Sequence, residues 1–264
     1  MGAERNLIFT IAFDRSNQPY YQMMAKMLVS SIQRSGFEGD VLILTNSPTR
    51  VFEYGRPNLE EISLDTSGIT DGDFGLQAQQ FKYRAREYVD AESYAKVLYV
   101  DADCLFLRNP EELLLADADL CFSEEPASLQ TSPWNNSYLT DEEMQKPSRL
   151  GANSGLWWVR SEHFQATLRE WERIDSLPEL REKRSDQPAW NRLVLDTART
   201  HCLRLGAEVH YPMMDQRTES EFAAAVLLHF NCAGAMRKLS HMFGNYMRHF
   251  HTSSAPALLS FLDG

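Results

Sequence analysis

The chain has 264 residues, of which 43% are hydrophobic and 11% aromatic, so it can bury a substantial core and is not typical of a disordered protein. Its formal net charge of −11 argues against nucleic acid or an anionic membrane surface as the partner. The four cysteines show no paired spacing, which favours free thiols in a reducing compartment over a disulfide framework.

The first apolar run, Leu7–Phe13, predicts a strand. It is too short to span a membrane and lacks the form of a signal peptide, so we expect no transmembrane segment and a cytoplasmic location. A helix is predicted from about Pro19 to Ser35, and a second strand over Val41–Thr45. This order is typical of a βαβ unit and hence of a parallel sheet, which binds ligands at the carboxyl ends of its strands.

The rest of the chain continues this alternation of strands and helices. Strands are predicted over Leu59–Leu64, Val97–Val100, Leu120–Ser123, Cys202–Leu205 and Ala225–Phe230, and helices over Gln77–Tyr88, Pro110–Ala116 and Ser161–Ile174. The polar segment Glu124–Leu150 has no periodicity and predicts a functional loop or lid. We expect one α/β domain over residues 1–264, with a mostly parallel central sheet flanked by helices, a nucleotide half over about 1–120 and an acceptor half over about 121–264.

Two aspartates, Asp101 and Asp103, follow the buried strand at Val97–Val100. Carboxylates are rarely buried unless they are paired or bind a metal, and oxygen ligands suit Mg²⁺ or Mn²⁺. One turn aspartate beside one salt-bridged aspartate is the alternative interpretation.

Three later segments have polar residues at the ends of predicted elements. Asn153-Ser154-Gly155 predicts a turn before a strand, where small residues allow a ligand to approach the backbone. Asp186-Gln187 precedes a predicted helix and also fits an ordinary N-cap. His229 closes an apolar strand, a position at which a lone histidine is more often structural than a ligand.

These four segments, in this order, resemble the nucleotide-sugar-dependent glycosyltransferases of the GT-A fold. They are most similar to the glycogenin-like retaining enzymes of glycosyltransferase family 8. The resemblance implies transfer of a sugar from a nucleoside-diphosphate donor, expected to be UDP-linked, to an acceptor that the sequence does not identify. It also implies Mn²⁺ or Mg²⁺ bound by Asp101, Asp103 and His229, with Asp101 and Ala102 close to the donor nucleotide.

The same resemblance implies roles for further residues. For the nucleotide base it suggests Thr10, Ala12 and either Tyr20 or Tyr21, although an aromatic residue at a helix start often packs the turn. For the phosphates and the sugar it suggests Lys82, Asn153, Ser154, Gly234 and Lys238, and for the catalytic contacts to the transferred sugar it suggests Asp186 and Gln187. Gly234 and Lys238 depart from the family's usual spacing after His229, so Arg237 is an alternative to the lysine.

We expect the acceptor pocket to be shaped by two segments, Glu124–Leu150 and Glu208–Ser220.

The alternative functions are a sugar nucleotidyltransferase and a non-catalytic binding module. A sugar nucleotidyltransferase needs a glycine-rich loop after the first strand, and Asp14–Gln18 contains no glycine. A non-catalytic nucleotide-sugar or glycan-binding module would not need the intact set Asp101, Asp103 and His229.

Overall fold

The computed structural model describes residues 5–15, 18–48, 58–69, 74–129, 150–178, 185–196, 202–213, 224–231 and 234–250. Its contacts divide the chain into two compact units. Unit 1 comprises Met1–Asn6, Ile69–Tyr99 and Ala116–Gly206, and unit 2 comprises Leu7–Gly68, Val100–Leu115 and Ala207–Gly264. The predicted single domain remains a prediction.

The central sheet has seven strands in the order β3-β2-β1-β4-β7-β6-β8. Their bounds are β1 Leu7–Ala12, β2 Asp40–Thr45, β3 Leu59–Ser63, β4 Lys96–Val100, β6 Leu120–Ser128, β7 Leu150–Arg160 and β8 Cys202–Leu205. The pairs β1–β2, β2–β3 and β6–β8 are parallel, whereas β6–β7 is antiparallel. A mainly parallel sheet flanked by helices confirms the predicted α/β class.

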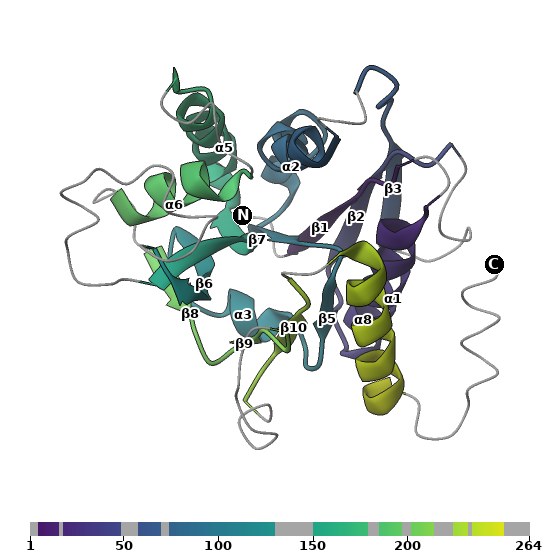
Figure 1. Cartoon of the computed structure of the whole chain (residues 1–264). Helices are drawn as coiled ribbons and strands as arrows, with labels where there is room; N and C mark the ends of the chain where they lie inside the picture. Colours follow the sequence, from purple (N-terminus) through teal and green to yellow (C-terminus); the bar gives the residue numbers. More distant parts are fainter. Residues whose placement is uncertain are drawn as a thin grey trace. The chain divides into compact units, whose positions relative to one another are not determined.

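Unit 2 combines the first βαβ segment with a small second sheet. Helix α1 (Tyr20–Arg34) connects β1 and β2, and the second sheet has the order β5-β10-β9. Its strands are β5 Cys104–Phe106, β10 Leu227–His229 and β9 Val209–His210, and a short helix α3 (Glu111–Leu114) follows β5. Helix α8 (Ala235–Phe250) lies beside α1 (Figure 1), and Ser30 Oγ and the Tyr246 hydroxyl form a buried hydrogen bond.

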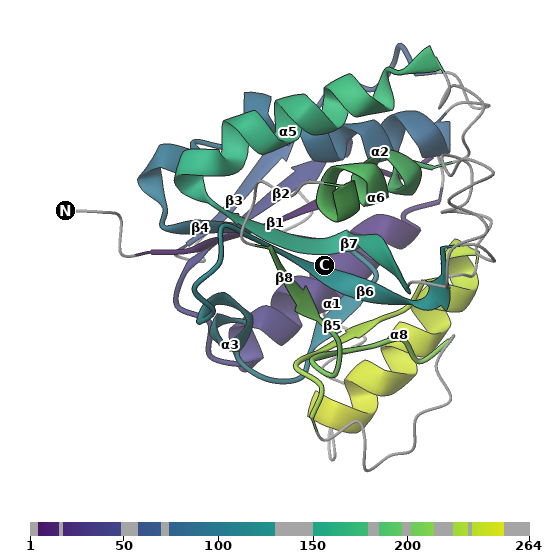
Figure 2. The same cartoon turned by 90° about the vertical axis from the view of Figure 1, so that its left-hand side faces the viewer.

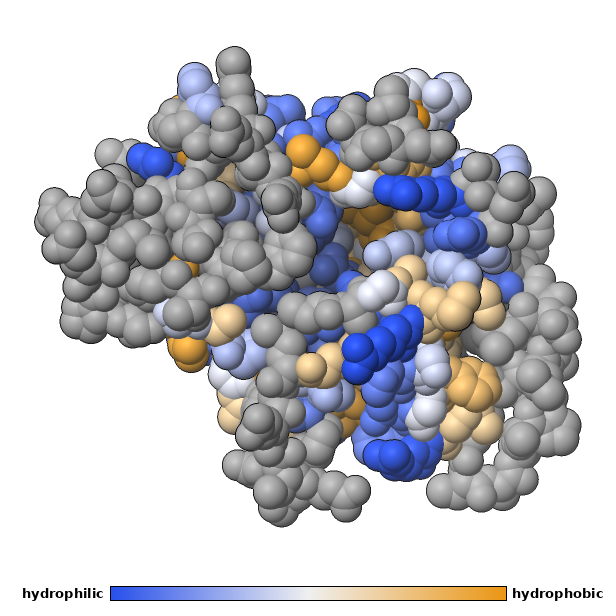
Figure 3. Space-filling model, viewed as in Figure 1, coloured by the Kyte–Doolittle hydropathy of each residue, from blue (hydrophilic) through white to orange (hydrophobic). Residues whose placement is uncertain are grey.

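The outward face of α8 is largely hydrophilic (Figure 3), in agreement with its exposed residues Arg237, His241 and Arg248.

Unit 1 is built around an aromatic core. Helices α2 (Phe74–Arg84) and α5 (Ser161–Asp175) lie side by side (Figure 2), and α6 (Gln187–Asp196) packs on β7. Two 3₁₀ turns, Ala85–Glu87 and Ala91–Ser93, connect α2 to β4. The fully buried rings of Trp157, Trp171 and Trp190 are in contact, with centroids 4.6 Å apart for Trp171 and Trp190. Because large aromatic surfaces are buried there, the core fixes α5 and α6 against β7.

Two sequence predictions need correction. The predicted loop over Glu124–Leu150 is wrong at its start, because β6 continues to Ser128 and pairs Glu124 with Ala152 of β7. Residues 130–149 lie outside the described part. Asn153-Ser154-Gly155 lies inside β7 and not in a turn, at a register irregularity where Phe122 pairs with Trp157 but Ser123 pairs with Asn153. The strand pairing is interrupted there, and small and polar residues such as Asn, Ser and Gly are common at such interruptions as well as in turns.

The remaining predicted helices and strands are present, with ends shifted by a few residues. Of the segment Glu208–Ser220, residues 214–220 are outside the described part, as is the C-terminal tail from residue 251. None of the helices in the described ranges is long and apolar enough to cross a membrane. Cys104, Cys121 and Cys202 are free thiols.

Candidate active site

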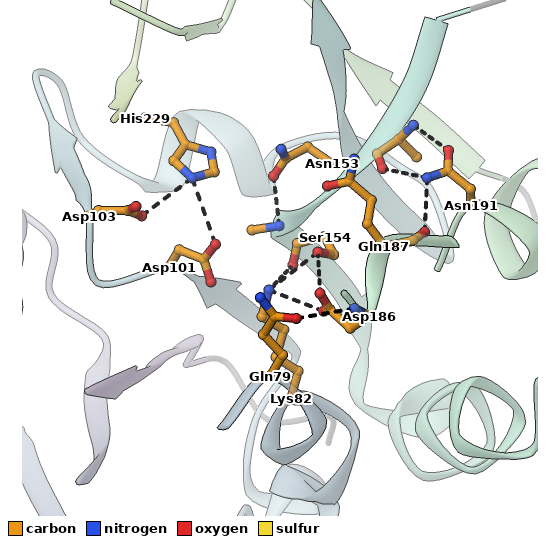
Figure 4. Close-up of polar contacts among 12 residues, drawn as sticks. Gln79, Lys82, Asp101, Asp103, Asn153, Ser154, Asp186, Gln187, Asn191 and His229 are labelled. Carbon is orange, nitrogen blue, oxygen red and sulfur yellow. Dashed lines mark hydrogen bonds and ion pairs between the residues drawn. The ribbon is translucent and has the colours of Figure 1, made fainter. Parts of the chain in front are cut away.

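The pairing of two short strands brings His229 next to the aspartates. Strands β5 and β10 are antiparallel, with His229 opposite Cys104, and Phe230 N donates to the Asp103 carbonyl at 2.9 Å. His229 Nε2 therefore lies 3.3 Å from Asp103 Oδ1 and 3.7 Å from Asp101 Oδ2 (Figure 4). Ala102, between the two aspartates, is buried in the turn that connects β4 to β5.

Lys238 on α8 completes this cluster. Its Nζ donates a hydrogen bond to Asp103 Oδ2. Burial by itself raises the pKa of Asp103, but the Lys238 ammonium and the His229 imidazole outweigh it and hold the pKa well below its usual range. Burial lowers the pKa of Lys238, but the Asp103 carboxylate outweighs it, so the pKa is raised overall and the lysine stays charged. Arg237, the alternative to this lysine, is exposed.

The cluster has features that suit a divalent cation. Asp103 and His229 are each only 1–2% exposed. Within the described part of the chain, neither Asp103 Oδ1 nor His229 Nδ1 has a partner in hydrogen-bonding geometry. Cys104 Sγ, a carboxylate oxygen of Asp103 and a ring nitrogen of His229 all lie within 4.8 Å of one another. Carboxylate oxygens and imidazole nitrogens are ordinary ligands of Mn²⁺, and a thiolate also suits Zn²⁺. We call Asp101, Asp103, Cys104, His229 and Lys238 the Asp103 group.

The loop after β1 lies near the Asp103 group. Burial raises the pKa of the Tyr21 phenol, and the charges that act on it are those of Lys238, Asp103, Asp101 and Asp14. Tyr21 N and Gln22 N donate to the Asp14 carboxylate at 2.7 and 2.8 Å, so this aspartate caps α1. Its own burial nevertheless raises its pKa to about 6.

The other three residues expected around the base lie in different surroundings. Thr10 is buried within β1, and its hydroxyl has no partner among the described residues. The Ala12 carbonyl accepts a hydrogen bond from Thr45 Oγ1 at 3.2 Å. Tyr20 lines a pocket of about 580 Å³ together with Gln18 and the start of α8 from Gly234 to His241.

Unit 1 contains a second buried polar cluster, formed by α2, β7 and the residue before α6. Lys82 Nζ lies 3.2 Å from Asp186 Oδ2 and donates to the Ser154 carbonyl and hydroxyl at 3.3 Å. Ser154 Oγ donates to Asp186 Oδ1 at 3.2 Å, and Gln79 accepts from Asp186 N (Figure 4). We call Gln79, Lys82, Ser154 and Asp186 the Lys82 group. All charge within it is paired.

Gln187, the first residue of α6, is fixed from two sides. Its backbone carbonyl accepts from Asn191 Nδ2 at 2.9 Å, while Asn191 also bonds both backbone groups of Ala152. Its side-chain Nε2 donates to Glu125 Oε2 at 2.7 Å. Asn153 Oδ1 accepts from Gly155 N at 2.7 Å.

The structure thus arranges the predicted residues in separate clusters within the two units. Several members were not identified from the sequence: Asp14, Gln79, Cys104, Glu125 and Asn191. Only Cys104 had a sequence signal, its position directly after Asp103. Asp14 is a polar residue of the loop after β1, and the other three are isolated polar residues in strands or helices.

The model of one protein family, described as nucleotide-diphospho-sugar transferase, matches residues 92–242. This range is more than half of the chain and contains Asp101, Asp103, Asp186, His229 and Lys238. The chain belongs to the nucleotide-diphospho-sugar transferase family. No curated protein matches it. Membership means that this transferase acts on a nucleotide-sugar donor, and both polar clusters include residues of the matched range.

Proposed function

We propose that this transferase is a metal-dependent enzyme of the glycogenin-like type. It would move a sugar from a UDP-linked donor to an unknown acceptor with retention at the anomeric carbon. The observation that supports metal dependence most directly is the buried Asp103–His229 pair, because Asp103 Oδ1 lacks a donor. A buried acceptor without a donor is unfavourable unless a cation or a ligand satisfies it.

Asp103 and His229 would hold the ion, with Asp101 as a further ligand or a contact to the ribose. When bound, Mn²⁺ or Mg²⁺ supplies Lewis acidity for the charge that develops on the departing diphosphate. Lys238 adds a fixed positive charge in the same cluster, and its raised pKa keeps it protonated at neutral pH. The pocket of about 580 Å³ beside Tyr20 and Gly234 has the size of a small-ligand site and would take part of the nucleotide.

The residues of unit 1 would act on the sugar. Ser154, Asn153 and Asp186 offer donors and acceptors that match sugar hydroxyls. Lys82 pairs with the Asp186 carboxylate at 3.2 Å and would orient it toward the sugar. Gln187 is neutral, so it would orient or polarise the sugar with its amide and would not form a covalent bond to it.

The decisive experiment is to measure the diphosphate released from a panel of nucleotide sugars, with and without Mn²⁺. We expect slow hydrolysis of one donor that requires the metal and is lost in Asp103→Ala. The matched control is Asp117→Ala, which removes a carboxylate that is 94% exposed. Release of pyrophosphate would identify a nucleotidyltransferase. If no donor is turned over and UDP with Mn²⁺ does not raise the melting temperature, the proposal is wrong.

A further inference from the structure

A second carboxylate in unit 1 contacts the proposed catalytic amide. Glu125 lies in β6 and is 2% exposed, and Gln187 is 7% exposed. Gln187 Nε2 donates to Glu125 Oε2 at 2.7 Å, across 62 residues of sequence. Burial of a carboxyl group is unfavourable unless hydrogen bonds compensate for the lost hydration, and this contact supplies one such bond.

The chemistry of the contact determines which way the amide of Gln187 is turned. An ionised carboxylate accepts hydrogen bonds and donates none, whereas a primary amide has one donating end and one accepting end. The structure has the nitrogen of Gln187 facing Glu125, the orientation that an ionised carboxylate requires, so its carbonyl oxygen Oε1 faces the other way. A glutamine beside a neutral amide could adopt either orientation, because each end of one amide matches an end of the other.

The backbone of Gln187 is fixed independently of the side chain. Asn191 joins the Gln187 carbonyl to both backbone groups of Ala152 in β7, with distances of 2.7–3.1 Å. Glu125 follows Glu124, which pairs with Ala152. The two ends of Gln187 are thus held by neighbouring strands of one antiparallel pair, so the side chain has little freedom to rotate.

We propose that Glu125 is a positioning residue that presents the carbonyl oxygen of Gln187 to the sugar. This inference rests on the proposed role of Gln187 in transfer. As the bond between the anomeric carbon and the diphosphate breaks, its electrons leave with the diphosphate and positive charge develops on the sugar. A carbonyl oxygen stabilises that charge, whereas an NH₂ group turned toward it is unfavourable. Glu125 therefore acts on kcat through Gln187 and does not itself contact the reacting atoms.

The test is a double-mutant cycle in the full-length protein, with kcat and KM for donor hydrolysis measured in the presence of Mn²⁺. We expect Glu125→Gln to lower kcat about tenfold with little change in KM, because the variant allows both orientations of the amide. The same substitution should have little effect in a Gln187→Ala background, where no amide remains to be oriented. Glu170→Gln, which removes a carboxylate paired with Arg173 on α5, is the control and should retain kcat.

A second readout does not depend on turnover. In the ¹⁵N-labelled protein, the side-chain amide signal of Gln187, assigned by its loss in Gln187→Ala, should be protected from exchange and should lose this protection in Glu125→Gln. If the signal is unprotected in the parent protein, the inference is wrong whatever the activity. If it is protected but no donor is hydrolysed, the proposed function fails and the orientation of Gln187 alone stands. Unchanged kcat in Glu125→Gln, equal losses in both backgrounds, or a sugar covalently bound to Glu125 would each overturn the positioning role.

Discussion

The Asp103 group and the Lys82 group both bury charge, but they differ in how that charge is satisfied. In the Lys82 group, the ammonium of Lys82 meets Asp186 and Ser154, and Ser154 also bonds Asp186. In the Asp103 group, Lys238 bonds Asp103, and His229 Nε2 lies 3.3 Å from Asp103 and 3.7 Å from a second carboxylate, Asp101. The first cluster holds one carboxylate and one ammonium, whereas the second holds two carboxylates, Asp101 and Asp103, and one ammonium. This difference suggests a neutral polyol as ligand for the Lys82 group and a cation for the Asp103 group.

The largest expected effect on activity distinguishes two neighbouring cations of α8, Lys238 and Arg237. Lys238→Met should lower the rate of donor hydrolysis by about 10²–10³, as expected for the loss of a charge that stabilises the leaving diphosphate. Arg237→Met should have a much smaller effect, because Arg237 is exposed while Lys238 bonds Asp103. The measurement is kcat for both variants at saturating Mn²⁺. A larger loss in Arg237→Met would show that the arginine provides the catalytic charge.

Substitutions in the Lys82 group should change mainly the free energy of unfolding of the protein. Lys82→Met leaves the buried Asp186 carboxylate without its cation and should lower the free energy of unfolding by about 3–5 kcal/mol. The double variant Lys82→Met/Asp186→Leu should be less destabilised than the single variant, because no unpaired charge remains. Urea unfolding at pH 7 measures both. If the double variant is the less stable of the two, the ion pair is not the main interaction in this group.

Stabilisation by metal should depend on the Asp103 group alone. Mn²⁺ with UDP at a hundred times the dissociation constant should stabilise the protein by about 2.7 kcal/mol, seen as a rise in the melting temperature. His229→Gln should abolish this rise. The control His163→Gln changes a partly exposed histidine of α5 and should retain it. An equal rise in His229→Gln would exclude the imidazole as a ligand.

The smallest expected effect concerns Asp14, which caps α1 beside Tyr21. Its pKa is raised from 3.8 to about 6, so between these values the folded protein binds more protons than the unfolded chain. The free energy of unfolding should therefore fall as pH rises from about 4 to 6, by about 1–2 kcal/mol after allowance for partial solvation. Asp14→Asn should remove this component of the pH dependence. Thermal melts across the window measure it, and identical profiles would contradict the assignment.

Local sequence patterns determined where several strands and helices begin or end, and which polar residues lie at those ends. The apolar run before Asp101 and Asp103 defined a buried strand with two carboxylates after it, and the same kind of run placed His229 at the end of another strand. Asp186 was correctly expected just before a helix, which begins at Gln187. These predictions succeed because a strand or helix end depends on residues that are neighbours in sequence.

Tertiary structure alone decided how these residues meet. His229 lies next to Asp103 because β5 and β10 pair in one register, which no local pattern specifies. The choice of Lys238 over Arg237 depends on which face of α8 packs inward. Glu125 was read as part of a polar loop, because its burial comes from pairing with β7 and its partner Gln187 is 62 residues away. The sequence identified the chemical groups, and the long-range packing of strands and helices determined which of them are in contact, because those contacts join residues far apart in the chain.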